Sequence, residues 1–383
     1  MKKRIVHLVV FGLISFFLQA QTVSTFVDEF PGDAELSFDA NGNIYVNDSG
    51  ENGVLNGKSV WKVTPSGSFS LFHDNLPSWL VGSIFDLNGN LLVTGWPPPG
   101  TISRITPDGN SSSIISTGIN GAGSLEIDEL GNIYVAEYLS HAVRKCQPDG
   151  SNCIPFSIGN PILNPAGLAY VEATGNLYVS NWTNGKIVKI DSNGNPTEFA
   201  QLPIPHAGPI KIYGNIMFVT CPLRHIIYKI DMNNPQNIDV LAGILDNPGN
   251  VDGDTSIATF NTPTGIGYNN GIFYVAETFQ GTGRLRVIDG VLANESHDRK
   301  EFSIRVYPNP AQNILNVRIN SQNLNLINVF VFDAHGCKMA IQRPKIQAKH
   351  FELDINHLSS GIYFIEISST ISNFSETQTF IKD

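Results

Sequence analysis

Several aromatic side chains fall in or beside turn-forming segments. Indole and phenol rings there can stack on sugar rings or grip a peptide, because they combine a large apolar face with a polar edge. Trp96 is the plainest example, within a Gly-Trp-Pro-Pro-Pro-Gly run at 95–100. The predicted ligand-binding residues are Trp79, Trp96, Tyr138, Trp182, His206, Arg224 and Phe279. Packing between loops is the alternative role for these side chains.

Imidazole is a common ligand of zinc and copper, so His141 and His225 are candidate metal ligands. Both stand at the same position of a sequence repeat, just before a predicted strand, which favours a structural role within each repeat. His206 has no counterpart in the repeat, but one histidine does not make a metal site. Acidic residues also close a strand in three repeats, where we expect them to accept hydrogen bonds: Asp48, Glu137 and Glu277.

The chain has four cysteines, and Cys146 and Cys153 flank a Gln-Pro-Asp-Gly-Ser-Asn turn that would place them opposite each other across a hairpin. A disulfide and a pair of small buried hydrophobic residues are both compatible with this placement. The sequence contains no nucleophile elbow, phosphate loop or Cys-x-x-Cys motif, which argues against several enzyme classes. No catalytic residue and no cofactor is predicted.

A repeat must position these candidates, because a Gly-Asn or Asn-Gly turn followed by an apolar strand recurs along the chain. The copies lie at residues 42–46, 89–93, 131–135, 175–179, 214–219 and 270–275. Each predicts four antiparallel strands in about 40 residues, which is typical of a propeller blade. We therefore predict an all-β protein with a six-bladed β-propeller over residues 22–290. The N-terminal strand near residues 23–27 should close the last blade and remove an unpaired sheet edge.

Residues 131–145, together with the loop at 241–265, resemble an NHL-repeat propeller, and the resemblance covers roughly residues 22–290. It implies the fold, while such propellers host binding, scaffolding and several enzyme chemistries. Gluconolactonase-type propellers of this shape hold a divalent ion through Glu, Asn and Asp ligands, for which Glu35 and Asn181 are weak candidates. Ala166 and Thr264 occupy positions where those lactonases have Asn or Asp, so the ligand set is incomplete. A cation such as calcium is expected only under an enzymatic alternative.

The two ends of the chain predict export. Basic residues 2–4 precede an apolar run at 5–18, which predicts a signal peptide over residues 1–20; the run is short for a membrane anchor. Residues 291–302 read as a linker before a small β-sandwich at 303–383. That sandwich is similar to the type A sorting domain of the type IX secretion system, through its Tyr-Pro-Asn-Pro opening at 307–310 and its Ser-Gly-Ile-Tyr strand at 360–363. An ordinary accessory sandwich is the alternative.

This resemblance implies a Gram-negative host, the type IX machinery as partner, passage through the periplasm, and a secreted or outer-membrane surface-attached product. The net charge of −10 argues against nucleic acid as a partner, and no transmembrane segment is expected in the mature chain. The predicted function is a secreted or cell-surface propeller that binds glycan or protein or acts as a scaffold. A gluconolactonase-like hydrolase or lyase that uses a divalent metal on the propeller axis is the alternative.

Overall fold

The computed structural model describes residues 21–50, 57–77, 79–279, 282–291, 303–320, 327–334, 336–341, 350–369 and 374–383. The predicted signal peptide and nearly all of the predicted linker lie outside these residues. Within them, the only helical elements are the 3-10 turns η1 (Tyr138–Ser140) and η2 (Pro222–Arg224). The all-β prediction is confirmed. In the same part of the chain, no helix has the length and apolar character to cross a membrane.

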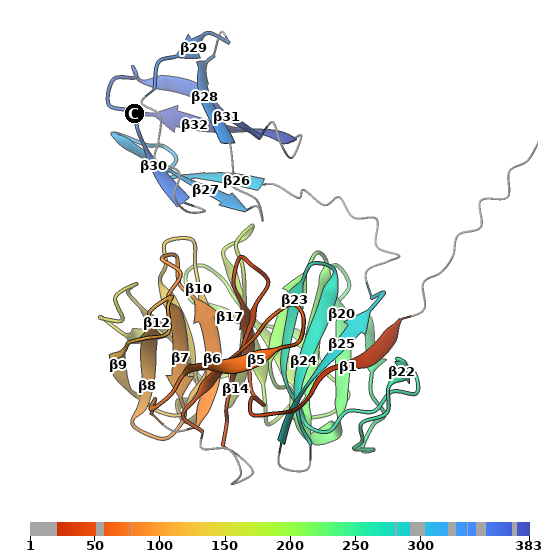
Figure 1. Cartoon of the computed structure of the whole chain (residues 1–383). Coiled ribbons are helices and arrows are strands. Elements are labelled where there is room, and N and C mark those ends of the chain that lie inside the picture. The colour runs from red at the N-terminus through yellow and green to blue at the C-terminus, as the bar shows by residue number, and fades with distance from the viewer. Residues whose placement is uncertain are drawn as a thin grey trace, which may run out of the picture.

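Four-stranded antiparallel sheets follow one another along the chain (Figure 1). The first sheet comprises β2 (Leu36–Phe38), β3 (Ile44–Asn47), β4 (Val60–Val63) and β5 (Phe69–His73); the second β6 (Leu80–Phe85), β7 (Leu91–Gly95), β8 (Gly100–Ile105) and β9 (Ser112–Ile119). The third comprises β10 (Ala122–Ile127), β11 (Ile133–Glu137), β12 (Ala142–Cys146) and β13 (Ile154–Ile158); the fourth β14 (Pro165–Val171), β15 (Asn176–Asn181), β16 (Lys186–Ile190) and β17 (Pro196–Gln201). The fifth comprises β18 (Ile210–Tyr213), β19 (Ile216–Cys221), β20 (Ile226–Asp231) and β21 (Ile238–Ala242).

An aspartate four residues before an asparagine builds the turn between the first two strands of several sheets. Asp39 Oδ1 accepts hydrogen bonds from the backbone N–H groups of Asn41 and Asn43, both at 2.9 Å. Gly42 between them has a positive φ of 80°, which glycine adopts without strain. Asp86 with Asn90 and Asp128 with Asn132 repeat the main contact at 2.9 and 2.8 Å. The turn is therefore an Asp-x-x-Gly-Asn unit.

The first strands of successive sheets contact one another: β2, β6, β10, β14, β18 and β23 (Pro263–Asn269) in order, with β23 also contacting β2. Small residues allow this close approach. A Cβ atom on Gly167 would lie 2.6 Å from Gly208 O, and one on Gly265 would lie 2.5 Å from Ala34 O. Larger side chains at these glycines would force the neighbouring sheets apart.

Polar side chains near the ends of three second strands join their sheets to the next sheet along the chain. Each donates a hydrogen bond to a backbone carbonyl: Asn47 to Val81 at 3.1 Å, Thr94 to Gly123 at 2.7 Å and Ser180 to Gly208 at 2.6 Å. These three residues each follow the repeated apolar strand segment, so one sequence position supplies the same contact between sheets in three repeats.

The sheet that contains the last repeat also contains the N-terminal strand. Its order is β22 (Gly253–Asp254), β1 (Thr22–Phe30), β25 (Thr282–Asp289), β24 (Ile272–Phe279) and β23. β1 pairs antiparallel with β25, from Thr22 opposite Asp289 to Phe30 opposite Gly283 (Figure 1). Val23, Val27 and Phe30 point inward and are at most 6% exposed. Segments more than 250 residues apart in sequence thus share one hydrophobic core.

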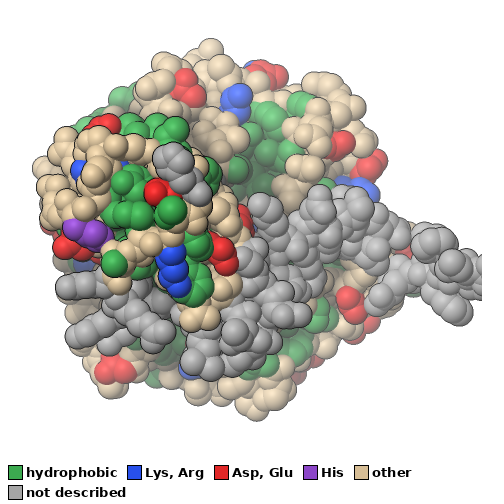
Figure 2. Space-filling view, turned by 90° about the horizontal axis from the view of Figure 1, so that it is seen from above, with side chains coloured by type: hydrophobic (Ala, Val, Ile, Leu, Met, Phe, Trp, Pro, Cys, Tyr) green, Lys and Arg blue, Asp and Glu red, His purple; other side chains and the backbone are tan. Residues whose placement is uncertain are grey.

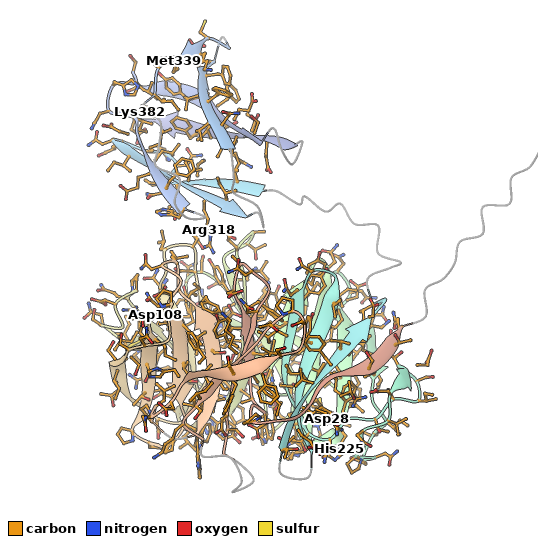
Figure 3. The ribbon with its side chains drawn as sticks, viewed as in Figure 1. Asp28, Asp108, His225, Arg318, Met339 and Lys382 are labelled. Carbon is orange, nitrogen blue, oxygen red and sulfur yellow. A yellow bond between two sulfur atoms is a disulfide. The ribbon has the colours of Figure 1, made fainter. Side chains whose placement is uncertain are left out.

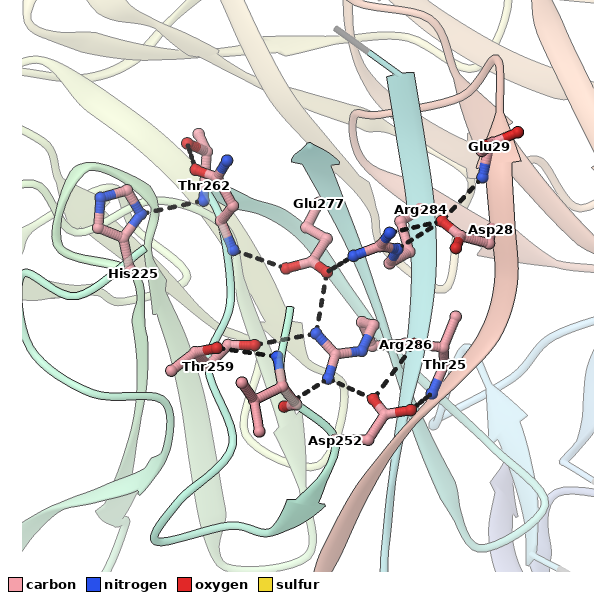
Figure 4. Close-up of polar contacts among 12 residues, drawn as sticks. Thr25, Asp28, Glu29, His225, Asp252, Thr259, Thr262, Glu277, Arg284 and Arg286 are labelled. Atoms are coloured by element: carbon pink, nitrogen blue, oxygen red, sulfur yellow. Dashed lines mark hydrogen bonds and ion pairs between the residues drawn. The ribbon is translucent and has the colours of Figure 1, made fainter. Parts of the chain in front are cut away.

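A buried arginine fastens this sheet (Figure 4). Arg286 on β25 donates hydrogen bonds to Glu277 Oε1 on β24 at 3.0 Å and to Asp252 Oδ1 at 2.6 Å. It also donates to the carbonyl of Thr259 at 2.9 Å. Asp252 Oδ2 in turn accepts the backbone N–H of Thr25 on β1 at 3.0 Å. One guanidinium group therefore links the last two strands to the loop that holds β1.

The C-terminal unit consists of two further sheets around a core of its own. The first has the order β26 (Ser303–Tyr307), β27 (Ile314–Asn320) and β30 (His350–Asp354), and the second β29 (Lys338–Met339), β28 (Ile327–Asp333), β31 (Gly361–Ser369) and β32 (Phe374–Lys382). Leu315, Val317, Ile365 and Phe380 are fully buried between them.

On the face seen in Figure 2, charged side chains lie singly or in small groups, and Lys and Arg are few.

Candidate functional site

A cavity of about 670 Å³ opens between the sheets, and we call it the axial cavity. Its lining comes from the starts of the first strands, from the loops before them and from the loops after the second strands. His225, labelled at the lower end of the sheets in Figure 3, directly follows η2 and marks this end. The lining residues are Ala34, Glu35, Ser49, Gly50, Trp79, Leu80, Val81, Trp96, Gly123, Tyr138, Pro165, Ala166, Trp182, Pro209, Pro222, Leu223, Thr262 and Thr264.

Four of the predicted ligand-binding residues line this cavity: Trp79, Trp96, Tyr138 and Trp182. Trp96 and Tyr138 meet edge to face, with ring centroids 5.1 Å apart. Trp79 is 54% exposed, and its carbonyl accepts the backbone N–H of Trp96 at 2.9 Å. Large apolar rings at an open cavity can stack on a ligand without first breaking a packed core.

Two of the other three predicted residues, His206 and Arg224, are absent from the described lining. His206 packs edge to face on Trp182 at 5.4 Å between centroids, so it supports a lining ring from behind. Arg224 pairs with Asp246 at 2.6 Å. Phe279 ends β24, and its side chain is outside the described part of the structure.

His141 and His225 share a structural role. Each directly follows a 3-10 turn and has a left-handed backbone conformation itself. Each also accepts a hydrogen bond from a backbone N–H through Nδ1, His141 from Asn164 at 3.0 Å and His225 from Thr262 at 3.1 Å. Burial lowers the pKa of His225. These contacts join one repeat to the next, whereas the shared repeat position had suggested a structural role within each repeat.

The acidic residues that close the second strands accept hydrogen bonds from turns. Glu137 accepts the N–H of Asn120 at 2.8 Å, and Glu277 accepts that of Asn261 at 2.8 Å. Burial raises the pKa of Glu277, against the lowering effect of Arg286.

Among the described lining residues of the axial cavity, Glu35 is the one carboxylate, and its side chain is 2% exposed. Glu35 Oε1 accepts a hydrogen bond from Ser124 Oγ at 3.1 Å, while Lys211 Nζ lies 3.9 Å from the same oxygen. Lys211 also donates to Glu126 Oε1 at 3.2 Å. Glu35 Oε2 is buried and has no hydrogen-bond partner among the described residues. We call Glu35, Ser124, Glu126 and Lys211 the Glu35 cluster.

Burial raises the pKa of Glu35 to about 7, although Lys211 and the Ser124 hydroxyl lower it. Burial likewise raises the pKa of Glu126. Desolvation lowers the pKa of Lys211, but the two carboxylates outweigh it and raise that pKa overall. A carboxyl group that titrates near neutral pH can either donate or accept a hydrogen bond at the cavity.

The two weak metal candidates do not come together. Asn181 Oδ1 accepts the N–H of Leu163 at 3.0 Å and its Nδ2 donates to the carbonyl of Pro161 at 2.7 Å, so its amide serves the backbone. The ammonium group of Lys211 stands beside Glu35, where a bound cation would meet like charge. Ala166 and Thr264 supply no carboxylate to the lining. These residues do not fit a divalent ion held as in the lactonases.

Cys146 and Cys153 are joined by a disulfide across the β12–β13 turn. Of the free cysteines, Cys221 is buried and Cys337 is exposed. Burial raises the pKa of the Cys221 thiol to about 12.

Sequence reasoning missed Ser124, Glu126 and Lys211. The detectable signal was a charged residue alternating with apolar ones in a first strand, as in Ile210-Lys211-Ile212. Such alternation ordinarily marks a solvent-facing side chain, whereas here it places the side chain among neighbouring first strands.

Residues 305–383 match the family described as secretion system C-terminal sorting domain. These residues are a type IX sorting domain. The sorting domain implies contact with the secretion machinery, export, and a secreted or cell-surface location. The match begins two residues after the start of β26, the first strand of the C-terminal unit, so it spans nearly the whole of that unit. No curated protein matches the chain.

Solved structures resemble the rest of the chain. A protein of unknown function from Bacteroides thetaiotaomicron has 15% identity and a TM-score of 0.58, over 70% of this chain and 76% of that one. A gluconolactonase from Xanthomonas campestris has 15% identity and a TM-score of 0.55, over 70% and 89%. Virginiamycin B lyase from Staphylococcus aureus has 16% identity and a TM-score of 0.50, over 70% and 98%. At these identities the likeness concerns the fold alone, which is a β-propeller.

Proposed function

We propose that this chain is an exported β-propeller that binds glycan in its axial cavity. The single observation that carries the proposal is a cavity of about 670 Å³ whose described lining holds four aromatic side chains and one buried carboxyl group. This volume lies in the range of roughly 300–1,000 Å³ that is usual for small-ligand sites. Trp96 and Tyr138 meet edge to face, which leaves ring surface for a sugar. A short stretch of sugar units can enter a cavity of this size, whereas a broad protein surface cannot.

The proposed architecture has six blades over residues 22–290, with NHL-like repeats. The pairing of β1 with β25 and the contact of β23 with β2 support a closed ring whose last blade includes the N-terminal strand. The proposed domains are a signal peptide at 1–20, the propeller at 22–290, a linker at 291–302 and the sorting domain at 303–383.

The proposed route is the general export pathway of a Gram-negative cell, then the periplasm, then the type IX machinery. Deletion of residues 303–383 tests it. We expect the deleted protein to accumulate in the periplasm while the full chain reaches the surface or medium. Equal export of both would contradict the route.

The enzymatic alternative has less support from the residues. Glu35 stands beside Lys211, and Asn181 is turned to the backbone, so the divalent-ion set of a lactonase is not assembled. The gluconolactonase and the lyase resemble this chain in fold only.

Isothermal titration of the mature chain, residues 21–383, tests glycan binding. The probes are maltotriose, cellotriose, xylotriose, mannotriose and chitotriose. We expect at least one to bind, and Trp96→Ala and Trp182→Ala each to weaken that binding about tenfold, because each removes a stacking ring. Trp61→Phe, outside the cavity lining, is the matched control and should bind normally. Failure of every probe to bind, or unchanged binding by both cavity variants, would overturn the proposal.

A further inference from the structure

The Glu35 cluster joins three sheets at the axial cavity and is unexplained by glycan stacking alone. Glu35 precedes β2, Ser124 and Glu126 lie on β10, and Lys211 lies on β18. Burying charged groups is costly unless each is paired and hydrogen-bonded, so an incompletely paired member needs an explanation.

Glu35 is that member. Its Oε1 is satisfied by Ser124 and lies near Lys211, whereas its Oε2 is buried without a hydrogen-bond partner among the described residues. Glu35 also belongs to the lining of the axial cavity, alongside the aromatic rings. An unpartnered carboxylate oxygen on a lining residue can accept a hydrogen bond from a ligand that reaches it.

From these contacts we infer that Glu35 anchors the bound sugar. Glu35 Oε2 accepts a hydrogen bond from a hydroxyl group of the sugar ring, while the aromatic rings stack on the faces of the sugar. This inference rests on the proposed glycan-binding function and deepens it. Such an anchor favours uncharged, hydroxyl-rich sugars over acidic ones, because a uronate would bring a further negative charge close to Glu35 and Glu126.

Sugar binding at Glu35 should be coupled to loss of the proton from its carboxyl group. A hydroxyl that donates to the carboxylate stabilises the ionised form of Glu35 over the protonated form. Binding should therefore release a proton near neutral pH and strengthen as the pH rises. Lys211 from β18 and Glu126 from β10 are the charged groups that face Glu35, and Tyr138 is the other titratable residue in the described lining.

The test is titration of the mature chain with whichever of the five uncharged trisaccharides binds, at pH 5.5 and pH 8.0. We expect affinity to be up to about tenfold higher at pH 8.0, equivalent to a shift of about one pKa unit on binding. Repeating the titration at pH 6.5 in two buffers of different ionisation enthalpy should reveal proton release. Trigalacturonate should bind more weakly than the uncharged trimers.

Glu35→Gln keeps the size of the side chain but cannot ionise. This variant should bind at the pH 5.5 strength of the wild type at both pH values and release no proton. Trp96→Ala is the matched comparison: it should weaken binding equally at both pH values and keep the pH ratio of the wild type.

The outcomes separate the two proposals. A flat wild-type profile, or a pH ratio retained in Glu35→Gln, overturns the anchor while leaving glycan binding intact, provided Trp96→Ala still weakens binding. If no trisaccharide binds, both proposals fail. Circular dichroism of each variant confirms that the fold is preserved.

Discussion

Arg286 Nη1 lies 3.0 Å from Glu277 Oε1, and neither side chain is exposed to solvent. The same guanidinium reaches Asp252, which holds Thr25 of the N-terminal strand. A buried ion pair adds little net stability compared with apolar packing, but removal of one partner leaves an uncompensated charge. The last two strands of the propeller and, through Asp252, its N-terminal strand are therefore linked to the guanidinium group of Arg286.

Arg286→Met should lower the free energy of unfolding by about 3–5 kcal/mol, because it leaves Glu277 buried without its main partner. Urea denaturation measures this. Arg224→Met is the control, since Arg224 pairs with Asp246, whose side chain is 56% exposed and stays hydrated without its partner, and it should cost much less. Adding Glu277→Gln to Arg286→Met should restore part of the loss. An effect of Arg286→Met no larger than that of Arg224→Met would contradict this view.

The N-terminal strand should contribute strongly to stability. Phe30→Ala removes a side chain that is 1% exposed, so it should cost about 3–5 kcal/mol. Deletion of residues 21–30 should cost more and promote aggregation, because it bares the edge of β25. Ser24→Ala, at an exposed position of the same strand, should be neutral. Thermal unfolding and light scattering provide the measurements; a deletion variant as stable and as monomeric as the parent would refute the role of β1.

The hairpins of the sheets could be predicted from the sequence, because Gly-Asn turns and period-two strands act over a few residues. The lining role of Trp79, Trp96, Tyr138 and Trp182 followed from their place in loops of a repeat. The Glu35 cluster could not be predicted in this way. Its members are separated by up to 176 residues, and only the meeting of the first strands brings them into contact. Likewise, nothing local distinguishes Asn181, whose amide serves the backbone, from a ligand that faces the cavity.

Glu35 should make stability depend on pH. Its pKa is about 7 in the folded chain against an ordinary 4.5, so the folded state holds the proton longer than the unfolded state does. Wild-type stability should therefore fall as the pH rises from about 4.5 to about 7, and then level off. Glu35→Gln cannot ionise and so avoids this loss. Its free energy of unfolding, compared with that of the wild type, should rise by on the order of 2 kcal/mol between pH 4.5 and 8.

Chemical denaturation of both proteins across that pH range measures the difference. Glu198→Gln, whose side chain is 48% exposed, is the control and should show no such trend. A constant difference between Glu35→Gln and the wild type would contradict the raised pKa.

The four cysteines should label in three distinct steps. In the native protein, iodoacetamide should modify Cys337 alone, because Cys221 is buried with a raised thiol pKa. Unfolding without reductant should add Cys221, and reduction should then expose Cys146 and Cys153. Mass spectrometry of tryptic peptides distinguishes the steps. Labelling of Cys146 or Cys153 before reduction would contradict the disulfide.

The most direct test of the central claim is a crystal structure of residues 21–383 with the tightest-binding trisaccharide. The account predicts a sugar ring in the axial cavity, against Trp96 or Trp182, with one hydroxyl within hydrogen-bond distance of Glu35 Oε2. A sugar bound elsewhere on the chain, with the axial cavity filled only by water, would contradict it.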